Sequence, residues 1–273
     1  MFDASDRTTI WGGASLYQVW HKRLQVLVSY TIVAVAISLI AWVILLALSA
    51  IVGFPGGVIG SVPISVLIGA LVSLLMLIFS KWSSTVGISI GPLADKKAEA
   101  KVKTVLESIC TQVGVAMPDI GQIDGAAIEV ASFARPRKHL IVLSNGAISA
   151  LSTLELEAVL AREIAKVRSG LSNYDAYLLV PRKLLALITL GAYPESVTLP
   201  IAQETMLVDL ASLAITRFPP ALISVLRKFR DEGTFFELKG ASAKGSSWLW
   251  INPPVISGSK TLLEDRIAQL EEW

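Results

Sequence analysis

Three charged residues lie close together on one predicted helix, in the stretch LELEAVLAREIAKVRSG (residues 154–170). They are Arg162, Glu163 and Lys166, and the apolar residues around them recur at helical spacing. Arg162 and Lys166 are four residues apart, which places them on one face of the helix. Two like charges at this spacing destabilise a helix by roughly 0.2–0.5 kcal/mol when exposed, and by more when buried. We therefore expect this face either to be solvated or to be supplied with acidic partners.

The carboxylates that could pair with these cations are Asp209, Glu204 and Glu163 itself. Asp209 and Glu204 belong to a later predicted helix, PIAQETMLVDLASLAITRF, on which Thr205 and Asp209 share a polar stripe. Ion pairs between the two helices would tie them together. An ordinary solvated face fits the sequence equally well, and neither interpretation requires catalysis.

The elements that must position these residues predict an α+β, mainly helical fold. An amphipathic helix in LADKKAEAKVKTVLESICTQVG is followed by three β-like segments, DIGQID, AIEVASFA and HLIVLS. Ser152 and Glu155 then form a predicted capping box at the start of the charged helix. Further helices are predicted in PPALISVLRKFRDE and TLLEDRIAQLEEW. We expect a small β-sheet packed against several helices.

The N-terminal part of the chain has the composition of a membrane segment. Residues 24–80 contain no charged side chain, and apolar runs occupy about residues 26–52 and 62–80. A helix needs about 20 apolar residues to cross a bilayer, and the intervening GFPGGVIGS predicts a tight turn. We expect a transmembrane hairpin; the alternative is a helical pair buried in a soluble core.

The charges that flank this hairpin predict its orientation. Lys22 and Arg23 precede the first span and Lys81 follows the second, while the turn carries no charge. Because positive residues stay on the cytoplasmic side, we expect a cytoplasmic N-terminal segment (1–23), a hairpin (24–80) and a cytoplasmic domain (93–273). The protein would be an integral protein of an inner or plasma membrane. The sequence does not define the membrane contact of residues 174–200.

The order of elements from about residue 93 resembles the HtpX-type membrane zinc metalloproteases, which are relatives of the CAAX prenyl proteases. The matching segments are MPDIGQID…ASFARPRKHLIVLSNGAISALSTLELEAVLAREIAKV, ETMLVDLASLA and INPP…LLEDRIAQL. The resemblance implies a zincin-type metallopeptidase-like domain. In the family, an H-E-x-x-H helix and a later Glu bind zinc, and the first Glu acts as general base on zinc-bound water.

The positions that match the family's zinc ligands carry other residues in this chain. Arg162 and Lys166 replace the two histidines, and Thr205 replaces the third ligand. A guanidinium and an ammonium offer no lone pair to a metal. Glu163 keeps the general-base position, while Glu204 is offset by one residue, or about 100° around the helix.

The remaining metal-binding side chains do not supply a replacement site. His21 precedes the first span, His139 opens a strand, and Cys110 lies on another helix. Ala131 and Asn252 stand where the family has an Asn and a C-terminal His. We therefore expect no metal and no cofactor.

Three functions remain open at this point. The favoured one is a catalytically inactive, membrane-anchored homologue that is not an enzyme and serves as a scaffold, assembly or regulatory subunit. Its partners would be the lipid bilayer and other membrane proteins, and Trp248, Trp250 and Trp273 would either contact a partner or pack locally. The alternatives are an active membrane-bound protease with an atypical metal site, and a protein that binds a lipid or small anion through Arg162 and Lys166. The net charge of +2, without a basic stripe, argues against nucleic acid.

Overall fold

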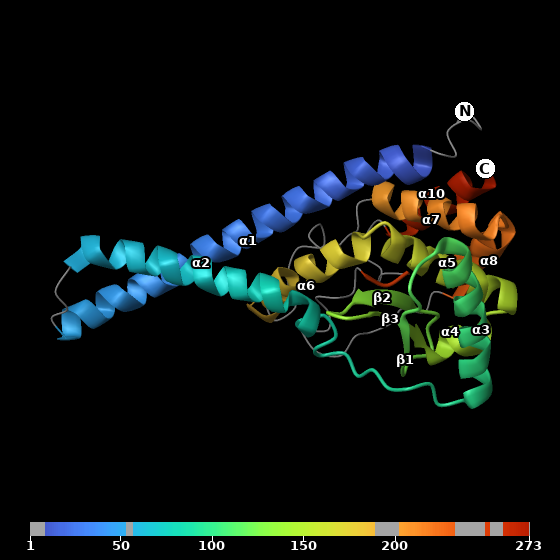
Figure 1. Ribbon diagram of the computed structural model, residues 1–273, viewed down its shortest axis with the longest axis horizontal. Helices are drawn as coiled ribbons and strands as arrows, with labels where there is room; N and C mark the ends of the chain where they lie inside the picture. The colour runs from blue at the N-terminus through green and yellow to red at the C-terminus, as the bar shows by residue number, and fades with distance from the viewer. Residues whose placement is uncertain (1–8, 53–56, 189–201, 233–248, 252–258, 273) are drawn as a thin grey trace.

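The computed structural model describes residues 9–52, 57–188, 202–232, 249–251 and 259–272. Two long N-terminal helices, α1 (Thr9–Val52) and α2 (Gly57–Ser83), form a hairpin that projects from a body of helices around a small sheet (Figure 1). The elements of the body are α3 (Lys96–Val113), β1 (Asp119–Ile123), β2 (Val130–Ala134), β3 (His139–Ser144), α4 (Asn145–Ala150), α5 (Thr153–Arg168), α6 (Leu171–Ile188), α7 (Ala202–Thr216), α8 (Pro219–Glu232) and α10 (Ser259–Glu271).

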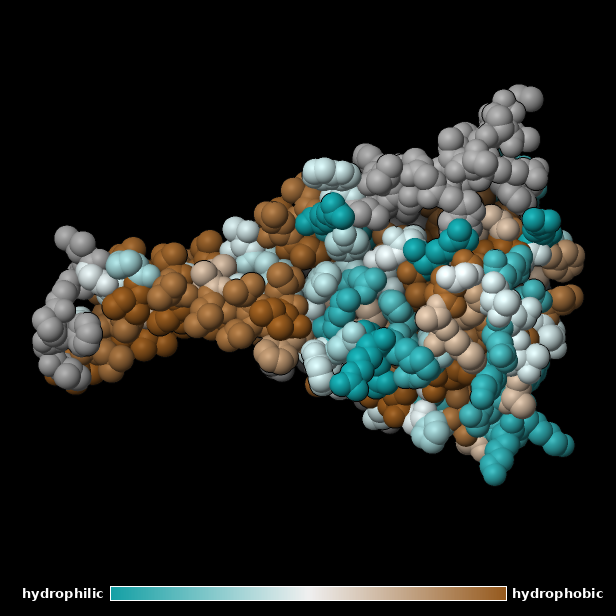
Figure 2. All heavy atoms as spheres, in the orientation of Figure 1, coloured by the Kyte–Doolittle hydropathy of each residue, from teal (hydrophilic) through white to brown (hydrophobic). Residues whose placement is uncertain are grey.

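Both hairpin helices are long and apolar enough to cross a membrane, over Lys22–Ile51 and Gly60–Ser83. The most apolar window of the first span has none of its residues buried, and that of the second has 17%. Figure 2 shows the hairpin as a continuous hydrophobic surface that extends away from the mixed surface of the body. The alternative of a helical pair in a soluble core does not agree with this exposure, because core helices bury their apolar side chains.

The helices of the hairpin are longer than the apolar runs. The first begins at Thr9, well before the apolar run, and the second begins at Gly57, inside the segment predicted to be a turn. A helix in lipid satisfies its backbone hydrogen bonds internally, so glycine is tolerated there although it favours turns in water. Residues 174–188 belong to α6, which packs against both α1 and α2; residues 189–200 lie outside the described part of the chain.

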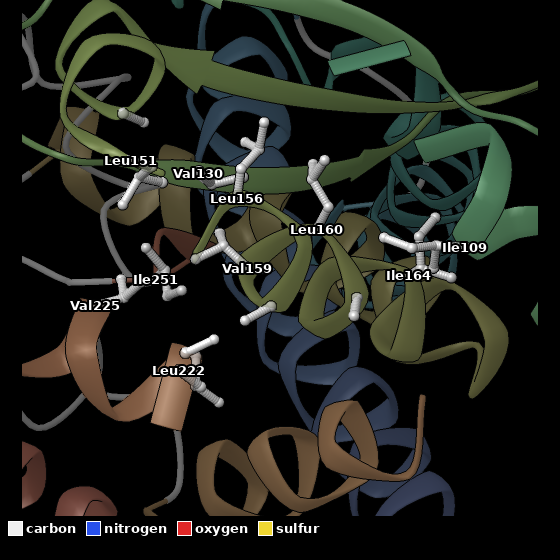
Figure 3. Close-up of a cluster of buried hydrophobic side chains, with 14 of the residues drawn as sticks. Ile109, Val130, Leu151, Leu156, Val159, Leu160, Ile164, Leu222, Val225 and Ile251 are labelled. Atoms are coloured by element: carbon white, nitrogen blue, oxygen red, sulfur yellow. The ribbon is translucent and has the colours of Figure 1, made fainter. Parts of the chain in front are cut away.

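The sheet is three-stranded and mixed, in the order β1-β3-β2, with β1 parallel and β2 antiparallel to β3. Alternate residues of β3 face two apolar clusters, as expected for a strand. Ile141 and Leu143 join the larger cluster, which includes side chains of α3, α5, α8 and α10. Figure 3 shows part of this cluster, with labelled residues of α3, α5 and α8. Leu140 and Val142 join the smaller cluster on the other face, with residues of α6 and with Val26 of α1. The sheet therefore lies between the α5 layer and the base of the hairpin.

Helix α5 is the central helix of the body. The predicted capping box is present: Ser152 N donates to Glu155 Oε2 (2.8 Å), and Glu155 N donates to Ser152 Oγ (3.3 Å). Helices α3, α6, α7 and α8 and strand β2 all pack against α5. As a result the helix is buried on nearly all sides, including the face that carries its charges.

Candidate functional site

The three charged residues of α5 are buried in the body. Arg162 is 5% exposed, Glu163 is 0% exposed and Lys166 is 6% exposed. A solvated face therefore does not describe them. Buried charges require partners, because an unpaired ion in the interior loses its hydration without compensation.

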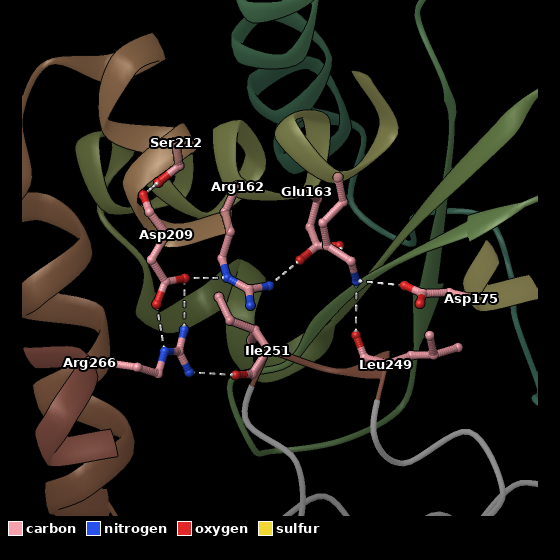
Figure 4. A network of polar contacts seen from close by, with 9 residues as sticks. Arg162, Glu163, Asp175, Asp209, Ser212, Leu249, Ile251 and Arg266 are labelled. Atoms are coloured by element: carbon pink, nitrogen blue, oxygen red, sulfur yellow. Dashed lines mark hydrogen bonds and ion pairs between the residues drawn. The ribbon is translucent and has the colours of Figure 1, made fainter. Parts of the chain in front are cut away.

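Asp209 of α7 supplies one of these partners and binds two arginines (Figure 4). Arg162 Nε donates to Asp209 Oδ1 at 2.7 Å. Arg266 of α10 donates two hydrogen bonds to the same carboxylate, from Nε to Oδ2 at 2.6 Å and from Nη2 to Oδ1 at 3.1 Å. Such fork-like contacts are among the stronger hydrogen bonds in proteins. Burial acts to raise the pKa of Asp209, but Arg266 and Arg162 outweigh it and hold that pKa below its usual value.

Glu163 connects the two cations of its own helix. Arg162 Nη1 donates to Glu163 Oε1 at 2.7 Å, and Lys166 Nζ lies 3.5 Å from Glu163 Oε2. Glu163 Oε2 accepts no hydrogen bond from the described residues, and Lys166 is its ion-pair partner. Burial acts to lower the pKa of Arg162, but Coulomb attraction from Asp209 and Glu163, together with their hydrogen bonds, outweighs it and raises that pKa, which keeps the guanidinium charged.

The network continues from Lys166 to the hairpin. Lys166 Nζ lies 3.8 Å from Asp175 Oδ2 of α6 and donates to the Leu249 carbonyl at 3.5 Å. Asp175 Oδ1 in turn accepts from Lys22 Nζ of α1 at 2.7 Å, and both of these side chains are buried. A chain of ion pairs thus joins α1, α6, α5, α7 and α10.

Sequence reasoning named only part of this network. Arg162, Glu163, Lys166 and Asp209 are brought together, whereas Thr205 is buried on α7 one turn before Asp209. The side chain of Glu204 lies outside the described residues, as do Asn252, Trp248 and Trp273. Trp250 packs edge-on against Phe133 of β2, with ring centroids 5.9 Å apart, which agrees with local packing.

Three members of the network were missed: Arg266, Asp175 and Lys22. Arg266 stands in the quoted segment LLEDRIAQL, where a charge beside apolar residues was a usable signal. Lys22 was assigned only to the flank of the first span. Asp175 had no local signal, because its partners are distant in sequence.

The donors at this site do not fit the zinc ion that the family resemblance implies. Among the described residues, no group of three or more His, Cys, Asp or Glu side chains is arranged to hold a metal. The two carboxylates, Glu163 and Asp209, are each occupied by cations, and Arg162 and Lys166 have no lone pair to offer. The arrangement can hold α5, α7 and α10 together through buried ion pairs. Removing one partner of such a pair destabilises a protein by about 3–5 kcal/mol.

Comparison with known proteins adds a distant similarity. No protein-family model matches the chain. It is similar to proteins named "Protease HtpX homolog" from Albidiferax ferrireducens, with 31% identity over 103 residues (37% of this chain, 35% of the relative), and from Prosthecochloris aestuarii, with 28% over 127 residues (46% and 38%). A third from Chlorobium phaeobacteroides is 30% identical over 127 residues (46% and 37%). The match covers little more than a third of the length of these relatives, and it supports a relationship to an HtpX-like family.

These names correct one prediction from the sequence. The missing zinc ligands led to the expectation that the protein is not an enzyme, and that expectation is wrong. The relatives are named as proteases, so the similarity points to an enzyme family. The substitutions that the resemblance implies at three ligand positions concern metal binding at one site, and they do not by themselves exclude activity.

Proposed function

We propose that this protein is a membrane-anchored, HtpX-like protein that binds other membrane proteins and serves in their assembly or regulation. The observation that carries the proposal is the continuous ion-pair network between the hairpin and the peptidase-like body. Lys22 on α1 and Asp175 on α6 fix the base of the hairpin to the body through a buried contact of 2.7 Å. A bound membrane protein that displaced the hairpin would therefore act directly on the body.

The proposed arrangement places residues 24–80 in the bilayer and residues 93–273 in the cytoplasm. Lys22, Arg23 and Lys81 all contact residues of α6 in the body, and positive residues flank membrane spans on the cytoplasmic side. Accessibility of Lys96 or Lys97 to a membrane-impermeant amine reagent in intact cells tests this orientation. Labelling before lysis would contradict it.

A second candidate is proteolysis centred on Glu163. It is favoured by the names of the relatives and by the Oε2 atom of Glu163, which accepts no hydrogen bond from the described residues. A carboxylate can serve as a general base; here its Oε2 atom also has Lys166 Nζ as an ion-pair partner at 3.5 Å. Proteolysis at Glu163 also requires an activated water molecule. The described neighbours of Glu163, Arg162 and Lys166, are cations and offer no metal ligand that would activate one.

One set of experiments separates the two candidates. The full chain is chemically cross-linked in its native membrane and then purified in a mild detergent, beside a control chain whose hairpin is replaced by an unrelated two-span hairpin. We expect discrete cross-linked membrane proteins with the natural hairpin and none with the control. Identical patterns for both chains would contradict the assembly role.

Cleavage of casein is measured on the same samples. Glu163→Gln is compared with Glu157→Gln, a partly exposed carboxylate on the same helix. Activity lost only in Glu163→Gln would establish the second candidate. Metal analysis gives an independent readout, because one tightly held zinc ion per chain would contradict the structural role of the Arg162–Asp209 pair.

A further inference from the structure

A cavity of about 1340 Å³ lies between α1, α2 and α6, apart from the ion-pair network. Its walls are mainly apolar side chains of the two hairpin helices, such as Leu27, Val35 and Leu74. Pockets for compact small molecules are about 300–1,000 Å³. This cavity exceeds that range and lies within the segment whose surface is suited to lipid.

The cavity owes its shape to the crossing of the two helices. At the crossing, a Cβ atom on Gly69 would lie 2.5 Å from the Ala34 carbonyl oxygen and would overlap Ser38 Oγ, so the backbones are in close contact there. Small residues permit such contacts between membrane helices. From this point the helices diverge toward the body (Figure 1).

The cavity is a wedge-shaped space between the helix crossing at Gly69 and the body, and its depth is that of one leaflet. The rise along α1 from Ser38 to Arg23 is about 22 Å at 1.5 Å per residue. This is half of the roughly 40–45 Å thickness of a bilayer with its headgroups. A lipid of the leaflet on the body side would therefore reach from the mouth to the crossing.

The mouth of the wedge carries two cations and two tyrosines. Arg23 Nε donates to Tyr174 Oη at 2.8 Å, which leaves the other guanidinium nitrogens available. Lys81 Nζ lies 5.7 Å from the ring centroid of Tyr177, within cation–π range. Neither cation forms an ion pair with any residue in the described part of the chain.

A basic turn of the body adds to this positive charge. Pro136, in the turn between β2 and β3, lines the same cavity. Its neighbours Arg135 and Arg137 are exposed. Trp82 lies beside the mouth, where an amphipathic ring suits the interface between lipid and water.

We propose that this cavity binds one anionic phospholipid from the leaflet on the body side. Its phosphate lies between Arg23 and Lys81, and its acyl chains run along the apolar walls toward Gly69. A guanidinium and an ammonium both bind phosphate, and basic pockets between membrane helices recognise anionic headgroups. A transmembrane helix of another protein would fill the apolar wedge but would leave both cations without a counter-charge.

The proposal is tested on the full chain in neutral detergent micelles. Phosphatidylglycerol is compared with phosphatidylcholine that has identical acyl chains, and bound lipid is counted by native mass spectrometry. We expect one retained phosphatidylglycerol, bound at least tenfold more tightly than phosphatidylcholine. Inorganic phosphate at the same concentration should not compete, because it lacks the chains.

Paired variants separate the headgroup from the chains. Arg23→Gln with Lys81→Gln should abolish the preference for phosphatidylglycerol, while Lys97→Gln with Lys103→Gln, two exposed lysines of α3, should keep it.

Thr31→Phe should block both lipids, because Thr31 lines the wedge. Ile32→Phe is the control, since Ile32 is the next residue of α1, is exposed and lies outside the cavity wall. Equal binding of the two lipids by the natural chain would overturn the proposal. So would a preference that survives loss of both cations, or a co-purified transmembrane segment that excludes lipid.

Discussion

Asp209 is the residue whose replacement tests the buried network most directly. It is 1% exposed and lies between Arg162 and Arg266, which approach it within 2.7 Å and 2.6 Å. Asp209→Asn keeps the shape of the side chain and removes its charge. Two buried guanidinium groups would then share one neutral amide, and each would face the repulsion of the other.

The expected loss follows from burial. Removing one partner of a buried ion pair destabilises a protein by about 3–5 kcal/mol, whereas a solvent-exposed pair contributes about 0–1 kcal/mol. Asp119→Asn is the matched control, because its pair with Lys138 at 3.1 Å has both side chains about half exposed. A change of 1 kcal/mol shifts the melting temperature of a 150–250-residue domain by about 2–4 °C. We therefore expect Asp209→Asn to lower it by about 6–20 °C.

The lone cysteine provides the assay. Cys110 is 4% exposed in the core of α3, and burial raises the pKa of its thiol. A thiol-reactive fluorophore will therefore label it slowly until the body unfolds. Because the chain has one cysteine, the signal has a single origin.

The result that would refute this reasoning is a melting temperature of Asp209→Asn equal to that of Asp119→Asn. A rescue experiment gives a second test. Replacing Asp209 and Arg266 together by apolar residues of similar volume should recover much of the loss, since Arg162 then keeps its ion pair with Glu163 at 2.7 Å. If the rescue variant stays as unstable as Asp209→Asn, the loss comes from packing at this position and not from an unpaired charge.

Three further outcomes follow from the same assay. Burial acts to raise the pKa of Glu155, but hydrogen bonds from Lys228, from the Ser224 hydroxyl and from the Ser152 backbone lower it to about 2. The stabilisation that this shift provides is present above pH 4.5 and is lost as pH falls toward 2. Glu155→Gln should therefore flatten the pH dependence of the melting temperature in that window. Lys22→Met should lower the melting temperature by more than Lys22→Met combined with Asp175→Leu, because the single variant leaves a buried carboxylate without its closest cation. Gly69→Leu should force the hairpin helices apart and destabilise the chain, whereas Gly60→Leu, with open space around its Cβ, should not.

Local signals predicted much of the fold. Ser152 and Glu155 marked the start of α5, the apolar spacing marked its buried stripe, and short β-branched runs marked the strands. These features depend on residues within a few positions of one another, so periodicity and capping chemistry reveal them.

The partners in the network could not be found in the same way. Arg266 is 57 residues from Asp209, and Lys22 is 153 residues from Asp175. Their pairing depends on how whole helices pack, which local spacing does not encode. Lys22 has two roles at once. It is a positive charge that flanks an apolar span, and it is also buried in an ion pair with Asp175.

The buried carboxylates explain why cations occupy the positions of Arg162 and Lys166. Glu163 and Asp209 are almost fully buried, and each would cost several kcal/mol without a positive neighbour. The resemblance implies that a zinc ion provides positive charge at this crossing of α5 and α7 in the family. Here the guanidinium of Arg162 and the ammonium of Lys166 provide positive charge beside these carboxylates.

The same electrostatic requirement connects the body to the membrane. Lys22 and Arg23 are neighbours on α1, yet Lys22 enters the buried network through Asp175 while Arg23 lines the mouth of the cavity. A lipid phosphate beside Arg23 would therefore lie next to the first ion pair of the network. Occupancy of the cavity and the position of the hairpin on the body are then linked through these two neighbouring residues. A shift of Arg23 toward a bound phosphate would also move Lys22, which holds α1 to Asp175 of the body.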